Sequence, residues 1–157
     1  MKLFQLNLLF AGGWCALFGT FDLGTFVWGF LLAFAALSLS SPMFGQTAYF
    51  KRVLFAARLG AYFLYELTVS GLQVASDVVT PGHRSRPAIV AVPLDIEEPI
   101  QITVLANLIS LTPGSLSLDV SPDGKTLYVH EMFCDDPEET RRRIKTGFER
   151  LVSEAMQ

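Results

Sequence analysis

The hydrophobic pattern divides the chain into an apolar N-terminal half and a more polar C-terminal half. Residues 3 to 39 form an almost unbroken apolar run, interrupted only at "GTFDLG" (19 to 24). We predict two helices there, at about 3–18 and 25–39, joined by this turn. Each is shorter than the ~20 residues that cross a full bilayer. A helical hairpin would still satisfy its own backbone hydrogen bonds in an apolar environment.

The N-terminal stretch "MKLFQLNLLFAGGWCA" has the single basic residue and the apolar run of a signal peptide. The apolar pattern resumes after the turn, however, and no convincing small-x-small cleavage site follows. Cys15 does not fit a lipoprotein site, because the bulky Trp14 precedes it. We therefore expect this segment to remain as a helix.

The most informative pattern lies in a third helix, predicted over 51–80 after a connector in which Pro42 and Gly45 act as breakers. At ~100° per residue, its polar side chains other than Thr68 fall within an arc of ~120°. The members of this polar stripe that we single out as candidates for a subunit interface or a polar cleft are Arg58, Tyr62, Glu66, Ser70, Gln73 and Asp77.

The path of this third helix relative to a membrane stays open at this point. Thirty residues span ~45 Å, more than the hydrocarbon thickness, so the helix could cross at a tilt or lie partly along the surface. Lys51, Arg52 and Arg58 lie near its N-terminal end, and Arg84 and Arg86 follow its C-terminal end. Three full spans would put these two basic groups on opposite sides, contrary to the positive-inside rule.

Glu66 is the one carboxylate between Arg58 and Asp77. Tyr62 precedes it by four residues, so its hydroxyl can reach the carboxylate on the same helix face. This spacing favours a structural carboxylate over a proton or cation relay, since relays need chains of ionisable groups.

From residue 86 onward the pattern becomes that of a small α+β domain. We predict a strand at Ala88–Val92, a helix from about Glu97 to Leu111, a hairpin around "SPDG" and a final helix after Asp136. The hairpin is predicted to turn Leu116, Leu118 and Val120 inward, together with Leu127 and Val129. The order βαββα resembles a ferredoxin-like fold without its last strand.

Composition supports this division into a membrane region (1–80) and a soluble domain (86–157). The chain is 51% hydrophobic and only 17% charged, too apolar for an ordinary soluble domain. Its net charge of −3 gives no reason to expect a nucleic-acid partner. Cys15 and Cys134 fall one in each region, which argues against a disulfide and fits a cytoplasmic location for the domain.

Signals for catalysis or for a cofactor are poor. The chain has no nucleophile elbow, no Walker loop and no dinucleotide-binding glycine pattern. His130, Glu131 and Cys134 could suggest a metal site, but a solvated strand end followed by a helix cap explains them better. Asp119 and His130 could face each other as an ordinary cross-strand pair. "RRRIK" (141 to 145) is most simply the outer face of the last helix, and a contact with the cytoplasmic leaflet or a partner is the alternative.

Several stretches together resemble one family, the E subunits of the Mrp-type multisubunit cation/proton antiporters. They run in order along the whole chain: "NLLFAGGW", "YFLYEL", "SGLQVASDVVTP", "PAIVAVPLD", "LANLISLTPGSLSLDVSPDGKTLYVHEM" and "DPEETRRRIKTGFERLV". The stretch from Leu105 to Met132 is the most specific.

The resemblance implies an accessory, structural or regulatory subunit of a bacterial inner-membrane Na+/H+ antiporter, needed for its assembly and activity. It implies a multi-pass protein with a cytoplasmic C-terminal domain, whose partners are the other subunits and the lipid bilayer. Na+ and H+ would be handled by the complex and not bound specifically by this chain. The alternative is a membrane-anchored cytoplasmic binding or sensor module that is not part of a transporter.

Overall fold

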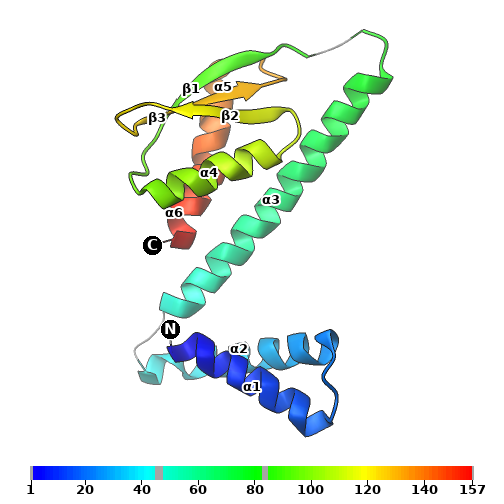
Figure 1. Cartoon of the computed structure of the whole chain (residues 1–157), viewed down its shortest axis with the longest axis vertical. Coiled ribbons are helices and arrows are strands. Elements are labelled where there is room, and N and C mark those ends of the chain that lie inside the picture. The colour runs from blue at the N-terminus through cyan, green and yellow to red at the C-terminus, as the bar shows by residue number, and fades with distance from the viewer. Residues whose placement is uncertain (1, 45–47, 83–84, 157) are drawn as a thin grey trace. The chain divides into compact units, whose positions relative to one another are not determined.

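The computed structural model describes residues 2–44, 48–82 and 85–156 (Figure 1). It is mostly helical, with one small antiparallel sheet. The chain forms two compact units, Met1–Val53 and Leu54–Gln157. Helix α3 (Ala48–Val79) contributes to both, since the division between them falls after its sixth residue.

The first unit is built on a helical hairpin of α1 (Lys2–Phe18) and α2 (Leu23–Phe44). Ala11, Cys15 and Ala33 are buried between the helices. At Gly29 a Cβ would lie 2.8 Å from the Cβ of Trp14, so only glycine lets the two backbones approach this closely. Small residues at such contacts are typical of helix pairs in apolar surroundings.

The second helix is longer than its sequence pattern predicted. It begins at Leu23 and continues to Phe44, so the prediction that Pro42 would break it was wrong. Proline removes one helical hydrogen bond, the one that the carbonyl of Ser38 would accept, and a helix in apolar surroundings can continue past it with a local adjustment. Gly45, the other predicted breaker, lies outside the described residues.

The second unit combines the rest of α3 with an antiparallel sheet in the order β1-β3-β2. Its core is formed by alternate residues of the strands together with one face of the helices, including Val90, Leu105, Leu127, Val129 and Phe148. The elements after α3 are β1 (Ala88–Pro93), α4 (Pro99–Leu111), β2 (Ser115–Val120), β3 (Thr126–Glu131), α5 (Pro137–Ile144), the π-helical turn η1 (Lys145–Glu149) and α6 (Arg150–Met156).

Strand β2 is oriented differently from the prediction. Leu116 and Leu118 are about half exposed, and the serines between and before them face α4 instead. Ser115 Oγ donates to Ile109 O and Ser117 Oγ to Ala106 O, at 2.7 and 3.0 Å. Ile109 lies in the last turn of α4, where the carbonyls have no i+4 donor within the helix, so the bond from Ser115 gives its carbonyl a partner.

A β-bulge corrects the alternation before the strand ends. The register shifts between Ser117 and Asp119, and Val120 returns to the core side opposite Leu127. The inward prediction for Val120, Leu127 and Val129 is therefore confirmed. Asp119 pairs with Tyr128, not with His130, so the predicted Asp119–His130 pair was wrong.

The C-terminal helix carries two of its basic residues toward the sheet. Arg141 Nε donates to Ala91 O at 2.7 Å, and Lys145 Nζ donates to Pro93 O at 2.8 Å. The interpretation of "RRRIK" as an outer face was wrong for these two residues, because the exposed carbonyls of β1 need donors. Arg142 fits the interpretation, since its side chain is exposed.

The π-helical turn places a buried carboxylate against the loop after β1. Glu149 is 3% exposed, and its Oε1 accepts bonds from the backbone N–H groups of Asp95 (2.5 Å) and Ile96 (3.3 Å). Lys145 Nζ lies 3.7 Å from its other oxygen. A π turn inserts one extra residue into the helix and so changes the direction in which the following side chains point. Such turns are frequent at functional sites.

Candidate functional site

Within the second unit, a polar cluster lies between α3 and the α+β domain. It lines a cavity of about 20 Å³, roughly the room for one water molecule. We call it the α3–domain cluster. Its polar members are Tyr62 and Glu66 from α3, Thr112 from the C-terminal cap of α4, Ser115 from the start of β2, Glu131 from the end of β3, and Arg143 from α5.

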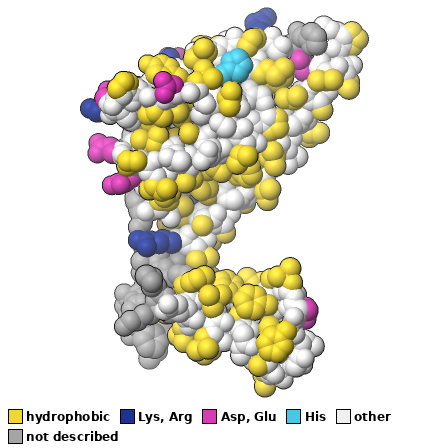
Figure 2. All heavy atoms as spheres, in the orientation of Figure 1, with side chains coloured by type: hydrophobic (Ala, Val, Ile, Leu, Met, Phe, Trp, Pro, Cys, Tyr) yellow, Lys and Arg dark blue, Asp and Glu magenta, His cyan; other side chains and the backbone are white. Residues whose placement is uncertain are grey.

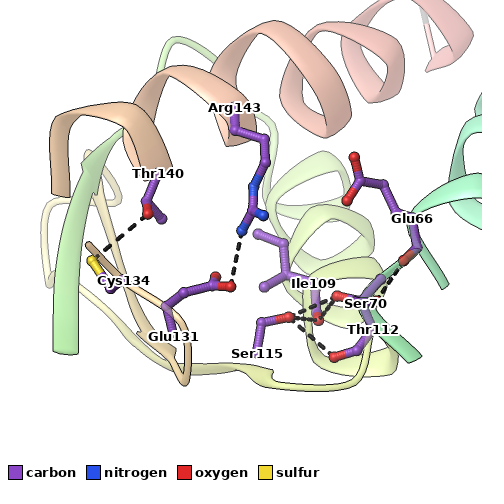
Figure 3. Close-up of polar contacts among 9 residues, drawn as sticks. All are labelled: Glu66, Ser70, Ile109, Thr112, Ser115, Glu131, Cys134, Thr140 and Arg143. Atoms are coloured by element: carbon purple, nitrogen blue, oxygen red, sulfur yellow. Dashed lines mark hydrogen bonds and ion pairs between the residues drawn. The ribbon is translucent and has the colours of Figure 1, made fainter. Parts of the chain in front are cut away.

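The strongest interaction in this cluster is the ion pair between Arg143 and Glu131. Arg143 Nη2 lies 2.9 Å from Glu131 Oε1, and the Glu131 side chain is only 8% exposed (Figure 3). Burial alone would lower the pKa of the Arg143 guanidinium. The charge and hydrogen bond of Glu131, and then the charge of Glu66, outweigh burial and raise that pKa above its ordinary value.

Glu66 extends toward the same arginine from the opposite side. Its carboxylate points toward the space below α5 in the close-up, and its charge acts on Arg143 (Figure 3). Tyr62 interacts electrostatically with Glu66 on the same helix face, as their i, i+4 spacing suggested. Ser70 Oγ donates to the Glu66 backbone carbonyl at 2.5 Å. One guanidinium thus faces two carboxylates from different parts of the chain.

The remaining residues of the polar stripe take different positions. Arg58 lies 3.9 Å from Glu154 at the edge of the domain, and Asp77 is buried at 3% exposure. Gln73 is exposed. The structure therefore brings Tyr62, Glu66 and Arg58 against the chain's own domain, and it does not bring Gln73 into the cluster. Whether the stripe also meets a partner protein stays a prediction.

Sequence reasoning missed the partners on the domain side. Arg143 belongs to a run of basic residues that looked like a solvated surface, and Glu131 looked like part of a strand end. A signal was available in the spacing from Thr140 to Ile144 and Phe148. These three residues are buried on one face of the helix, and Arg143, the neighbour of Ile144, lies at the border of that face.

A second polar feature caps the hairpin. Asp22 Oδ1 accepts from the Thr25 backbone N–H at 3.0 Å, and Asp22 Oδ2 accepts from Thr25 Oγ1 at 2.6 Å. The hydroxyl bond first, and then the backbone bond, lower the pKa of the Asp22 carboxyl. This carboxylate is an N-terminal cap for α2.

Comparison with known families decides what kind of protein carries these features. Residues 7–155 match the model of the family MNHE, described as Na+/H+ ion antiporter subunit. The chain belongs to this antiporter subunit family. Among its relatives is the E subunit of the Na+/H+ antiporter of Alkalihalophilus pseudofirmus, 32% identical over 95% of this chain and 94% of that protein.

Two solved assemblies contain chains with a similar structure. One is the Mrp complex from Dietzia sp. DQ12-45-1b, with a TM-score of 0.50 and 25% identity over 65% of this chain and 96% of that chain. The other is the membrane-bound sulfane sulfur reductase, an archaeal respiratory membrane complex. Its matching chain has a TM-score of 0.57 and 25% identity, with 96% of both chains covered.

The antiporter subunit is a membrane protein, and two of its helices are long and apolar enough to be candidate spans. They are Leu23–Ser40 and Phe50–Val79, while Leu3–Phe18 is a shorter apolar helix. Hydrophobic side chains dominate the visible face of the hairpin (Figure 2). In the part of the chain that the structure describes, no three His, Cys, Asp or Glu side chains lie close enough together to hold a metal ion.

Proposed function

We propose that this chain is an accessory subunit of a multisubunit antiporter that exchanges Na+ or another monovalent cation for protons. The observation that carries the proposal is the family match over residues 7–155. It covers both units of the chain, so the likeness is not that of a single shared domain. The similar chains in two multisubunit membrane complexes support a role inside an assembly.

The role that fits this chain is structural or regulatory rather than catalytic. Its relatives are transporter components, and the charges of its α3–domain cluster serve internal contacts, as with Arg143 and Glu131. We propose that Na+ and H+ move through other subunits and that this chain supports their assembly. The exposed Gln73 and the half-exposed Arg58 are the stripe residues that remain available to such a partner.

We propose a bacterial inner-membrane location with the α+β domain in the cytoplasm. The hairpin supplies the apolar anchor, and α3 belongs with the membrane region (1–80) because its outer face is apolar. The soluble region then begins at 86. The antiparallel order β1-β3-β2, with α4 and α5 packed against the sheet, supports a relationship to ferredoxin-like folds lacking the last strand.

Purification of the tagged chain from its own host tests the function. We expect it to co-elute with large multi-span subunits, and we expect deletion of its gene to abolish Na+-driven proton exchange in everted vesicles. Complementation with the intact chain is the control. A complex that assembles and exchanges ions without the chain would refute the proposal, and a stable lone chain would favour the membrane-anchored binding module.

A further inference from the structure

Within the second unit, α3 presents two different faces. The face toward the α+β domain is half-buried and includes Leu59, Tyr62, Phe63 and Glu66. The opposite face carries large apolar side chains that are 61–79% exposed; they are Leu54, Leu64, Leu72 and Val79. Yellow side chains follow the outer edge of this helix in Figure 2.

The domain meets α3 at contacts spread over about half of the helix, from Arg58 to Val74. Near one end, Arg58 pairs with Glu154 of α6 at 3.9 Å. In the middle, the Tyr62 ring packs edge-on against Phe148, with 5.1 Å between centroids. Farther along, Val74 reaches the Gly114 backbone, where an added Cβ would lie 3.5 Å from Val74 Cγ2. From Arg58 to Val74 the covered stretch measures ~24 Å.

This covered stretch is incompatible with a span. The hydrocarbon core is ~30 Å thick, and the parts of α3 outside the stretch, 48–57 and 75–79, measure only ~15 Å and ~8 Å. A crossing α3 would carry the adjoining domain into the hydrocarbon with it. Charged side chains such as Arg150, Glu154 and Arg143 would then be placed in lipid, which is strongly unfavourable.

We propose that α3 does not cross the bilayer but lies in its surface from Leu54 to Val79. The apolar outer face sits at the boundary of headgroups and acyl chains, and the inner face carries the α+β domain on the water side. A helix with one apolar and one polar face is suited to this position. The polar stripe is then the attachment surface of the domain and not the lining of a pathway through the membrane.

The distribution of basic residues supports the same arrangement. Lys51 and Arg52 precede the surface-lying stretch, Arg58 is part of it, and Arg84 and Arg86 follow it. If α3 does not cross, all five lie on one side, which satisfies the positive-inside rule without a third span. Arg58 and Arg86 have carboxylate partners in Glu154 and Asp135. The positive charge of Lys51 and Arg52, beside the start of the stretch, complements the anionic lipid headgroups of a cytoplasmic leaflet, which favours a lipid surface as the occupant of the outer face.

Labelling of single cysteines in the full-length chain tests the topology. The background carries Cys15→Ala and Cys134→Ala, and the probes are Lys51→Cys, Ser76→Cys and Lys125→Cys, the last in the β2–β3 turn. We expect a membrane-impermeant maleimide to modify all three in everted vesicles and none of them in right-side-out vesicles. Modification of Lys51→Cys from the side opposite to the other two would overturn the proposal.

Spin labels then identify what covers the outer face. Placed at residues 54, 64, 72 and 79 of the full-length chain in native membranes, they should all show a similar shallow depth from oxygen and nickel-chelate accessibility. A depth that rises to a maximum in the middle would indicate a span and overturn the proposal. Labels reached by neither reagent would indicate a protein partner instead of lipid and would overturn it equally. Both tests rest on the membrane location alone, so their failure leaves the antiporter assignment untouched.

Discussion

Arg143 connects α3 and the sheet through its interactions with two carboxylates. It pairs with a carboxylate that is almost fully buried and is attracted by a second one on α3. Leaving Glu131 without a partner would cost more than the pair itself contributes, because a buried charge cannot be solvated. The Arg143 side chain is 45% exposed, so water screens part of its interaction with Glu131.

We therefore predict that Arg143→Met lowers the stability of the solubilised full-length chain by about 1–3 kcal/mol. Arg142→Met is the matched control, since Arg142 is an exposed neighbour and should change stability by no more than about 0.5 kcal/mol. Thermal unfolding followed by circular dichroism measures both. Equal shifts in the two variants would contradict the assigned role of Arg143.

Asp22 makes the hairpin sensitive to acid. Its pKa is lowered in the folded chain by Thr25, so its stabilising effect is present above its usual pKa and is lost as pH falls through the folded value. We predict that the unfolding temperature of the hairpin falls from about pH 5 to pH 3. Trp14 and Trp28 are the only tryptophans and both lie in the hairpin, so tryptophan fluorescence reports it selectively.

Asp22→Asn provides the matched variant for this pH dependence. Asparagine caps a helix about as well as aspartate but does not titrate in this range. We expect the variant to keep its stability near neutral pH and to show a weaker fall in acid. An unchanged acid response would show that groups other than Asp22 control it.

At the scale of elements, the C-terminal helix and α3 fit together through one glycine. A Cβ at Gly147 would overlap the Tyr62 hydroxyl and would lie 2.8 Å from its Cζ. Both atoms belong to a side chain held between Phe148 and Glu66, so Tyr62 cannot move away cheaply. The π-helical turn around Gly147 is what brings this position against α3.

We predict that Gly147→Ala destabilises the second unit by about 1–3 kcal/mol, although alanine is normally the better helix former. Gly60→Ala is the control, because nothing lies within 4 Å of its added Cβ, and it should raise stability by about 0.5–1 kcal/mol. Thermal unfolding followed by circular dichroism shows whether each variant is less or more stable than the unchanged chain. Tyr62→Phe should partly rescue Gly147→Ala, and the absence of any rescue would contradict the proposed overlap.

The same elements show how far the sequence could predict this molecule. Local signals sufficed for the hairpin turn, for the strand beginning at Ala88 and for the cap at Asp136, because each depends on neighbouring residues. The orientation of β2 could not be predicted, since Leu116 is turned outward by serine bonds to α4. The stripe around Glu66 was visible, but its partner Arg143 lies far along the chain, and helical periodicity carries no such information.

At the scale of the whole molecule, Glu66 is a contact between two parts of the chain. Its carboxylate interacts with Tyr62 and is attracted by Arg143, whose main partner is Glu131. A relay would need ionisable groups leading onward across the membrane. If α3 lies in the membrane surface, Glu66 is also outside the hydrocarbon core. Glu66 therefore adds to a contact between α3 and the domain whose main ion pair is that of Arg143 with Glu131.

Glu66→Gln in the intact antiporter separates attachment from ion movement. We predict that the variant assembles normally and that Na+/H+ exchange per assembled complex is unchanged, because glutamine keeps the shape and Arg143 keeps Glu131. Glu131→Gln is the comparison; it removes the main counter-charge of Arg143 and should lower the amount of complex without changing exchange per complex. Quantified co-purification and proton flux in everted vesicles measure both. Normal assembly with lost exchange in Glu66→Gln would make Glu66 part of the ion pathway, and the surface position of α3 would then have to be abandoned as well.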